Sequence, residues 1–146
     1  MLMHRIWPFV TVLLFAASLL LGNAHAQTVS PQDTNAAQTV IRDQLSAFQA
    51  GEHERAFSHA APNIRTVFET SERFVSMVKN GYPPIYDPKN FSFGRNRMAD
   101  DTIFQEVFVT GPKGQQWQAL YTLQQQDDGS WKITGVHMNP SRGAAT

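Results

Sequence analysis

The spacing of apolar residues changes once along the chain, near Tyr82, and this change limits the possible folds more than any other feature. Before Tyr82, apolar residues recur at the three- and four-residue spacing of helices that bury one face. After it, apolar and polar residues alternate, as in strands that bury one face of a sheet. Because short helices are not stable alone, the helical half needs the sheet to pack against. This order predicts an α+β fold.

Four helices are expected before Tyr82. The first begins at Ser30 or a little later, because Ser30 suits the N-cap and Pro31 suits the first helical position. It ends by Gly51, a residue that commonly follows the last turn of a helix. Shorter helices are then expected over 52–60, 62–68 and 70–81.

Four strands are expected after Tyr82, because turn-forming Pro, Gly and Asp residues separate four alternating segments. In the third, Trp117, Tyr121 and Leu123 share one face, which is predicted to be the buried one. Gly135 stands where the parity of the last segment changes, and this predicts a bulge that curves the sheet. The result is an α+β roll, a bent antiparallel sheet wrapped over helices. The strands are expected over 91–98, 103–110, 117–126 and 130–138.

Residues 1–26 have the order of a secretory signal peptide. A short segment with Arg5 precedes the mostly apolar run 6–21, and an A-x-A sequence ends at Ala26. An uncleaved anchor needs about 20 apolar residues, and here the run is shorter and Pro8 interrupts it. We therefore expect cleavage between Ala26 and Gln27, no stable membrane anchor afterwards, and a periplasmic or secreted protein. The remaining chain is expected to divide into an N-terminal segment (27–38), the roll (39–138) and a flexible tail (139–146).

Composition argues against several classes of function. The 12 Lys and Arg residues balance 12 Asp and Glu residues, so the chain has no general attraction for nucleic acid. With no cysteine, it has no disulfides, thiolate zinc sites or cysteine nucleophile. His53-Glu54 begins like a zinc-protease helix, but Phe57 occupies the position of the second histidine. No metal site and no cofactor are predicted.

Several phrases carry a resemblance to a known family: AFSHAAPNIR at 56–65, FVSMV at 74–78, GYPPIY at 81–86, WQALY at 117–121 and DGSWKITG at 128–135. On these phrases nearly all of 39–138 resembles a proteobacterial domain-of-unknown-function family, number 4864. That family is similar to the nuclear-transport-factor-2-like superfamily, which implies a cone-shaped, cystatin-like α+β roll. The resemblance implies no activity, because the superfamily includes isomerases, dehydratases, ligand carriers and dimerisation modules.

An aromatic-rich set of residues is typical of a ligand pocket. Phe91, Phe93, Arg95 and Arg97 share one parity of a strand, and their rings would bury an apolar or amphiphilic ligand whose acid binds a guanidinium. The alternative is a solid core, with Gly94 breaking the parity so that both arginines face water. The candidate pocket is Phe91, Phe93, Arg95, Trp117, Tyr121, Trp131 and His137. A non-catalytic binding module is the preferred interpretation.

An acid/base enzyme, similar to isomerases or dehydratases, is one alternative function. The resemblance implies a carboxylate base and an oxyanion-stabilising tyrosine or protonated acid in an apolar cone. The candidates are Tyr121, His137, and Asp43 or Asp87. Since the pattern places no carboxylate convincingly in the interior, no catalytic residue is assigned.

A homodimeric accessory module is the other alternative. If Ile103, Val107 and Val109 fill the core, Phe104 and Phe108 on the same strand point outward. Exposed aromatic side chains on a sheet face favour a partner, and a second copy of the chain is the simplest one. The resemblance also implies sheet-to-sheet dimers.

Overall fold

A computed structural model describes residues 27–141 of the chain. The expected signal peptide and its cleavage site before Gln27 involve residues outside this range, as does most of the expected tail. No helix of the described part is long and apolar enough to cross a membrane. The elements are α1 (Pro31–Gln49), α2 (His53–Ser58), α3 (Pro62–Phe68), α4 (Ser71–Gly81), α5 (Pro83–Tyr86), β1 (Asn90–Ala99), β2 (Thr102–Thr110), β3 (Gln116–Gln125) and β4 (Trp131–Pro140).

The helix starts follow from local capping. The Asp33 N–H donates to Ser30 Oγ at 3.0 Å, and Pro31 opens α1, as predicted. Thr70 caps α4 by accepting the Arg73 N–H at 3.2 Å. The single turn α5 is the one helix that was not expected, because its two prolines were interpreted as a break although proline is well suited to the first turn of a helix.

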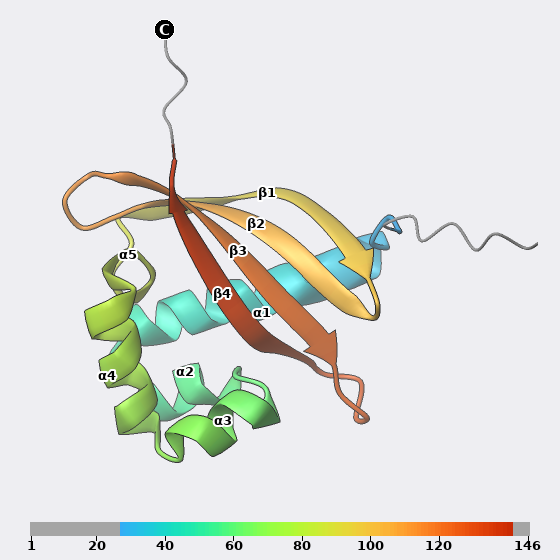
Figure 1. Ribbon diagram of the computed structural model, residues 1–146, viewed down its shortest axis with the longest axis horizontal. Helices are drawn as coiled ribbons and strands as arrows, with labels where there is room; N and C mark the ends of the chain where they lie inside the picture. Colours follow the sequence, from blue (N-terminus) through green and yellow to red (C-terminus); the bar gives the residue numbers. More distant parts are fainter. Residues whose placement is uncertain (1–26, 142–146) are drawn as a thin grey trace, which may run out of the picture.

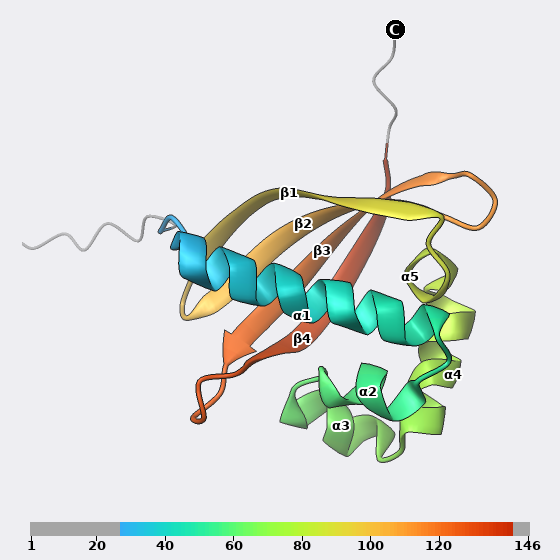
Figure 2. The same ribbon diagram turned by 180° about the vertical axis from the view of Figure 1, so that it is seen from behind.

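The strands form one antiparallel sheet in the order β1-β2-β3-β4. The sheet curves, and α1 crosses its inner face, while α2, α3 and α4 lie on the side of α1 toward β4 (Figures 1 and 2). Buried Ile103, Val107 and Val109 of β2 belong to the same core cluster as Ile41 and Leu45 of α1. This is the α+β roll expected from the sequence.

Two register shifts bend the sheet. One lies between β3 and β4, where Thr122 pairs with Gly135 and Leu123 pairs with Ile133, so the predicted bulge before Gly135 is confirmed. The other lies in β1 between Phe93 and Asn96.

Gly94 lies within the bulge of β1 and allows its close approach to β2. A Cβ atom at Gly94 would lie 2.7 Å from Cε2 of Phe108 and 2.9 Å from Oε2 of Glu106. The absence of a side chain therefore permits this approach.

At the other edge of the sheet, β4 continues to Pro140, two residues beyond the expected end of the strand. The division of the whole chain into segments stays a prediction.

Candidate ligand-binding site

The inner face of the sheet collects four residues of the predicted pocket. Phe91 and Phe93 pair with Val109 and Val107, which are buried residues of β2. Trp117 also pairs with Val109, and Tyr121 lies on the same face of β3, where it pairs with Gln105. The alternation predicted for the third strand is therefore confirmed, and these four aromatic residues face the helices.

The predicted position of Arg95 is wrong, because the bulge in β1 moves it to the opposite face from Phe93. Its side chain is 90% exposed, and its guanidinium lies 3.3 Å from Glu106. Arg97 pairs with Phe104 on the same outer face, with its guanidinium 4.0 Å from the centre of that ring. Strand β1 therefore places no arginine beside the inner aromatic face. This agrees with the alternative prediction, in which Gly94 breaks the parity of the strand.

Tyr121 and the two remaining members of the predicted set, Trp131 and His137, do not share one pocket. Tyr121 is fully buried, and burial raises the pKa of its phenol. Its hydroxyl has no hydrogen-bond partner within the described part of the chain. Trp131 is buried in the same core cluster. His137 pairs with Leu120 on the outer face and is exposed.

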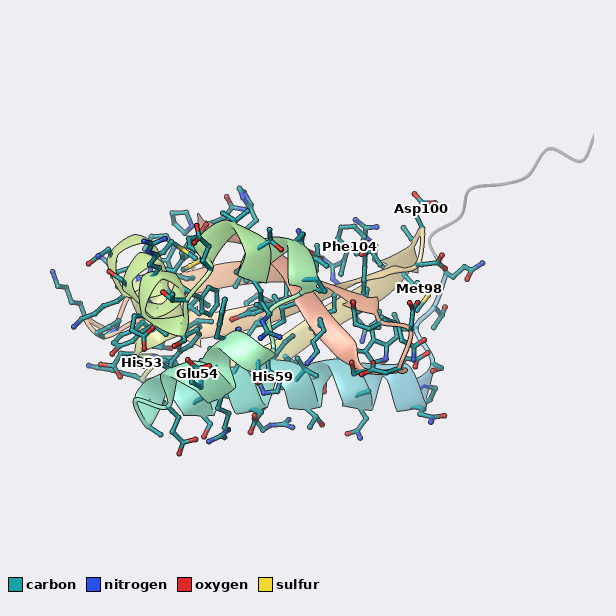
Figure 3. The ribbon with its side chains drawn as sticks, turned by 90° about the horizontal axis from the view of Figure 1, so that it is seen from below. His53, Glu54, His59, Met98, Asp100 and Phe104 are labelled. Atoms are coloured by element: carbon teal, nitrogen blue, oxygen red, sulfur yellow. The ribbon has the colours of Figure 1, made fainter. Side chains whose placement is uncertain are left out.

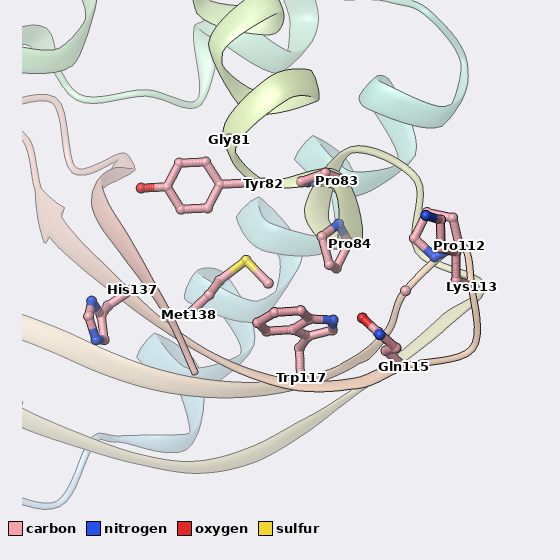
Figure 4. A pocket seen from close by; sticks show the side chains of 11 residues that line it. Gly81, Tyr82, Pro83, Pro84, Pro112, Lys113, Gln115, Trp117, His137 and Met138 are labelled. Atoms are coloured by element: carbon pink, nitrogen blue, oxygen red, sulfur yellow. The ribbon is translucent and has the colours of Figure 1, made fainter. Parts of the chain in front are cut away.

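A groove of about 580 Å³ lies between the α4–α5 corner and the loop that joins β2 to β3. We call it the hairpin groove. Trp117 and Met138 project from the sheet toward Tyr82 and Pro84, whereas the His137 ring lies on the other side of β4 (Figure 4). The residues that line it are Gly81, Tyr82, Pro83, Pro84, Gly111, Pro112, Lys113, Gln115, Trp117, His137 and Met138.

The chemistry of the hairpin groove is mostly apolar. Tyr82, Trp117 and Met138 are half-buried, so each still presents part of its apolar surface. Lys113 is the cation of the lining, and it forms no salt bridge within residues 27–141. The lining contains no Asp or Glu that could serve as a general base. The arrangement is suited to binding an apolar group beside an anionic one.

The carboxylate proposed for acid/base chemistry lies elsewhere. Asp43 accepts hydrogen bonds from Arg55 Nη2 at 2.6 Å and Nε at 3.1 Å, and His59 Nε2 lies 2.5 Å from its Oδ2. The Arg55 bonds, followed by the His59 bond, lower the pKa of Asp43 to about 2. Figure 3 shows His59 at the end of α2, beside α1. This cluster joins the two helices and contains neither Tyr121 nor His137.

Asp87, the other candidate carboxylate, and the His53-Glu54 pair do not line the hairpin groove. Asp87 is exposed at the end of α5. His53 and Glu54 lie at the start of α2 (Figure 3), and residues 27–141 hold no group of three His, Asp or Glu side chains that could bind a metal ion.

Most of the hairpin groove was not predicted from the sequence. Trp117 and His137 were predicted site residues, whereas Pro83, Pro84 and Lys113 lie in segments whose sequence indicates only turns. The groove forms where residues 81–84 and 111–115 meet across the end of the sheet. Strands β1 and β2 lie between these two segments in the chain, and neither segment contains a binding motif.

Comparisons with known proteins agree with the fold. A family model described as a domain of unknown function, DUF4864, matches residues 30–146. The crystal structure of an NTF-2 like protein of unknown function from Silicibacter pomeroyi DSS-3 matches with a TM-score of 0.55 at 12% identity, covering 78% of this chain and 100% of that one. A search of curated proteins finds no match. The fold is NTF2-like, and the chain belongs to the DUF4864 family.

Proposed function

We propose that this protein is a non-catalytic binding module that holds a small amphiphilic molecule with an anionic head group in the hairpin groove. The observation that carries the proposal is the combination, in one groove, of the half-buried apolar side chains Tyr82, Trp117 and Met138 with the cation Lys113. Small-molecule sites are typically apolar with a few polar groups that fix orientation, and volumes of about 300–1,000 Å³ are usual. The groove, at about 580 Å³, lies within that range.

The two parts of the groove would contribute differently to binding. Covering the exposed parts of Trp117 and Met138 contributes about 25 cal/mol for each Å² of apolar surface removed from water. The ammonium of Lys113 then attracts a carboxylate or phosphate as a point charge, with less directional preference than an arginine. The apolar contacts would supply most of the affinity and the lysine would orient the ligand.

Decanoate is a suitable probe of this proposal. We expect it to bind the protein and to change the fluorescence of Trp117, and we expect Lys113→Gln to weaken binding about fivefold, which corresponds to about 1 kcal/mol for a partly exposed ion pair. Trp117→Phe tests whether the fluorescence change arises in the groove. Trp131 is buried and does not line the groove, so the change should be lost in this variant.

Arg95→Gln is the matched control, because it removes a 90% exposed cation from the outer face of the sheet. It is expected to leave decanoate affinity unchanged. The proposal fails if decanoate does not bind, or if Arg95→Gln weakens binding while Lys113→Gln does not.

A second candidate function, homodimerisation through the outer sheet face, rests on Phe108. This side chain is 40% exposed, points away from the core and pairs with Gln118. Arg95 and Glu106 add charges of both signs to the same face, so a two-fold related copy can present complementary groups.

The dimer candidate predicts a concentration-dependent mass in light scattering coupled to size exclusion. Phe108→Glu is expected to leave a monomer at concentrations where the unmodified protein is dimeric, because it would bury charge in the interface. Val67→Glu changes another exposed apolar residue, 71% exposed on α3, and should leave the dimer intact. A wild-type monomer up to high micromolar concentration would rule this candidate out.

A further inference from the structure

A second cavity lies directly beside the hairpin groove. It has a volume of about 280 Å³ and lies between α3, α4 and the inner face of β4; we call it the α3 cavity. Tyr82 lines both spaces. Val136 lines the α3 cavity and Met138 lines the hairpin groove, and these residues are two positions apart on the same strand. Side chains two apart on a strand share a face and lie about 7 Å from each other, so the two spaces are neighbours along β4.

The lining of the α3 cavity is mostly apolar. Ile64 and Phe68 of α3 and Met77 of α4 contribute to its walls. Gln44 is the buried polar side chain among the lining residues, and its amide Nε2 already donates to the carbonyl of Ala56 at 3.1 Å. Because one N–H of Gln44 is bonded to the protein and most of the other lining side chains are apolar, the cavity favours an alkyl chain over a charged group.

The helix that covers the cavity, α3, packs against the core through partly buried side chains only. No residue of α3 is buried, and Ile64 and Phe68 are half-buried over the cavity. The start of α3 is fixed, because the Ala61 N–H donates to the Ile133 carbonyl of β4 at 2.8 Å. Regions with few buried apolar contacts open at low free-energy cost, so α3 is the part of the wall that most readily moves.

The end of α3 is strained. Glu69 has φ 65° and ψ −43°, and the Thr70 N–H donates to the Phe68 carbonyl at 2.7 Å across it. This is the γ-turn with positive φ, which is rare and strained for a residue other than glycine. Movement of α3 about this turn can release that strain while the other end of the helix stays bonded to β4.

We infer that the ligand is a single-chain amphiphile whose head group binds at Lys113 and whose alkyl tail passes Tyr82 into the α3 cavity, with α3 as its cover. This inference rests on the proposed function and adds the shape of the ligand. Its support is that the cation lies in the groove, whereas the cavity beyond Tyr82 has a mostly apolar lining with no charged side chain. A compact anionic ligand would leave the cavity unused.

A series of straight-chain alkanoates from hexanoate to dodecanoate, titrated below their micelle concentrations, tests the inference. Each buried CH₂ is worth about fourfold in affinity. We expect affinity to rise through the whole series, because the tail continues into the α3 cavity after the groove is filled. In Ile64→Trp, where the larger side chain occupies the cavity, hexanoate should bind as in the wild type and dodecanoate should bind at least tenfold more weakly.

Val67→Trp is the matched control, since it adds similar bulk to the same helix at a side chain that is 71% exposed and does not line the cavity. It should bind every member of the series as the wild type does. Circular dichroism checks folding, and Met77→Trp fills the same cavity from α4 should Ile64→Trp misfold.

The outcomes separate the two claims. If neither hexanoate nor dodecanoate binds the wild type, the proposed function itself is wrong. If hexanoate binds but affinity stops rising with chain length, or if the cavity-filling variants bind dodecanoate as the wild type does, the groove remains a binding site and the inference about the α3 cavity is overturned.

Discussion

Replacing Gln105 with leucine is expected to lower the free energy of unfolding by about 3 kcal/mol. Gln105 is fully buried on the inner face of β2, opposite the bulge of β1. A bulge leaves backbone groups outside the regular ladder, and Gln105 Nε2 donates to the carbonyls of Gly94 at 3.2 Å and Glu106 at 2.8 Å. Leucine has a similar size but cannot donate, so these carbonyls would lose a partner in a buried place.

The acceptor side of Gln105 adds to the expected loss. Its Oε1 accepts from Gln38 Nε2 of α1 at 3.3 Å and from Asn96 Nδ2 of β1 at 3.2 Å. The side chain therefore joins the bulge to both the helix and the neighbouring strand. Because each bond is part of one network, the loss is expected to exceed that of a single hydrogen bond, which is about 1 kcal/mol.

Urea unfolding followed by tryptophan fluorescence measures this effect. Gln118→Leu is the matched control, since Gln118 lies on the outer face of β3 opposite Phe108 and is only half-buried. Its expected change is within about 0.5 kcal/mol. Equal small effects of the two substitutions would show that the bulge does not depend on Gln105.

Much of the fold could be predicted from the sequence because its signals are local. Ser30 and Thr70 cap helices through bonds to residues three positions away. The bulge before Gly135 was visible because apolar residues on both sides of it, Ile133 and Val136, face inward and reveal the change of parity.

The bulge in β1 was ambiguous for a physical reason. After Phe93, the next inner-face residue is Asn96, which is polar, so no apolar residue immediately marks the change of face. Asn96 can occupy that position because Gln105 and Thr34 accept hydrogen bonds from it, and these partners are far apart in the sequence. The pairing of Arg95 with the inner aromatic face was predicted wrongly for that reason.

The candidate site was less predictable than the fold. Trp117 could be placed on the inner face by alternation alone. Trp117 lies across the groove from Tyr82 and Pro84 because the α4–α5 corner packs near the end of the sheet. The spacing of apolar residues along the chain does not predict that packing. Lys113 likewise belongs to a turn whose sequence indicates only a change of direction.

Replacing Tyr121 with phenylalanine is expected to raise the free energy of unfolding by about 1–2 kcal/mol, the opposite sign to the effect at Gln105. Tyr121 pairs with Gln105 across β2 and β3, and both side chains are fully buried. Gln105 has partners for its amide, whereas the Tyr121 hydroxyl has none among residues 27–141. A buried hydroxyl without a partner loses its hydration and gains no bond, which costs about 1–3 kcal/mol.

Tyr86→Phe is the control for the loss of a phenolic hydroxyl, because Tyr86 is half-buried near the surface and its ring stays packed against Phe48. Its expected change is within about 0.5 kcal/mol. If Tyr121→Phe is destabilising in the same urea measurement, the hydroxyl has a stabilising partner and the explanation above is wrong.

The same substitution distinguishes core from catalytic or ligand-contacting roles for Tyr121. An acid/base enzyme would need this phenol to contact a ligand, and burial alone raises its pKa without supplying a base. In the proposed binding module the ligand lies in the hairpin groove, whose lining does not include Tyr121. Tyr121→Phe should therefore be more stable and bind decanoate with unchanged affinity. A gain in stability together with a loss of affinity would mean that the hydroxyl is kept at a cost for contact with a ligand, and the binding site would then extend into the core behind Val136.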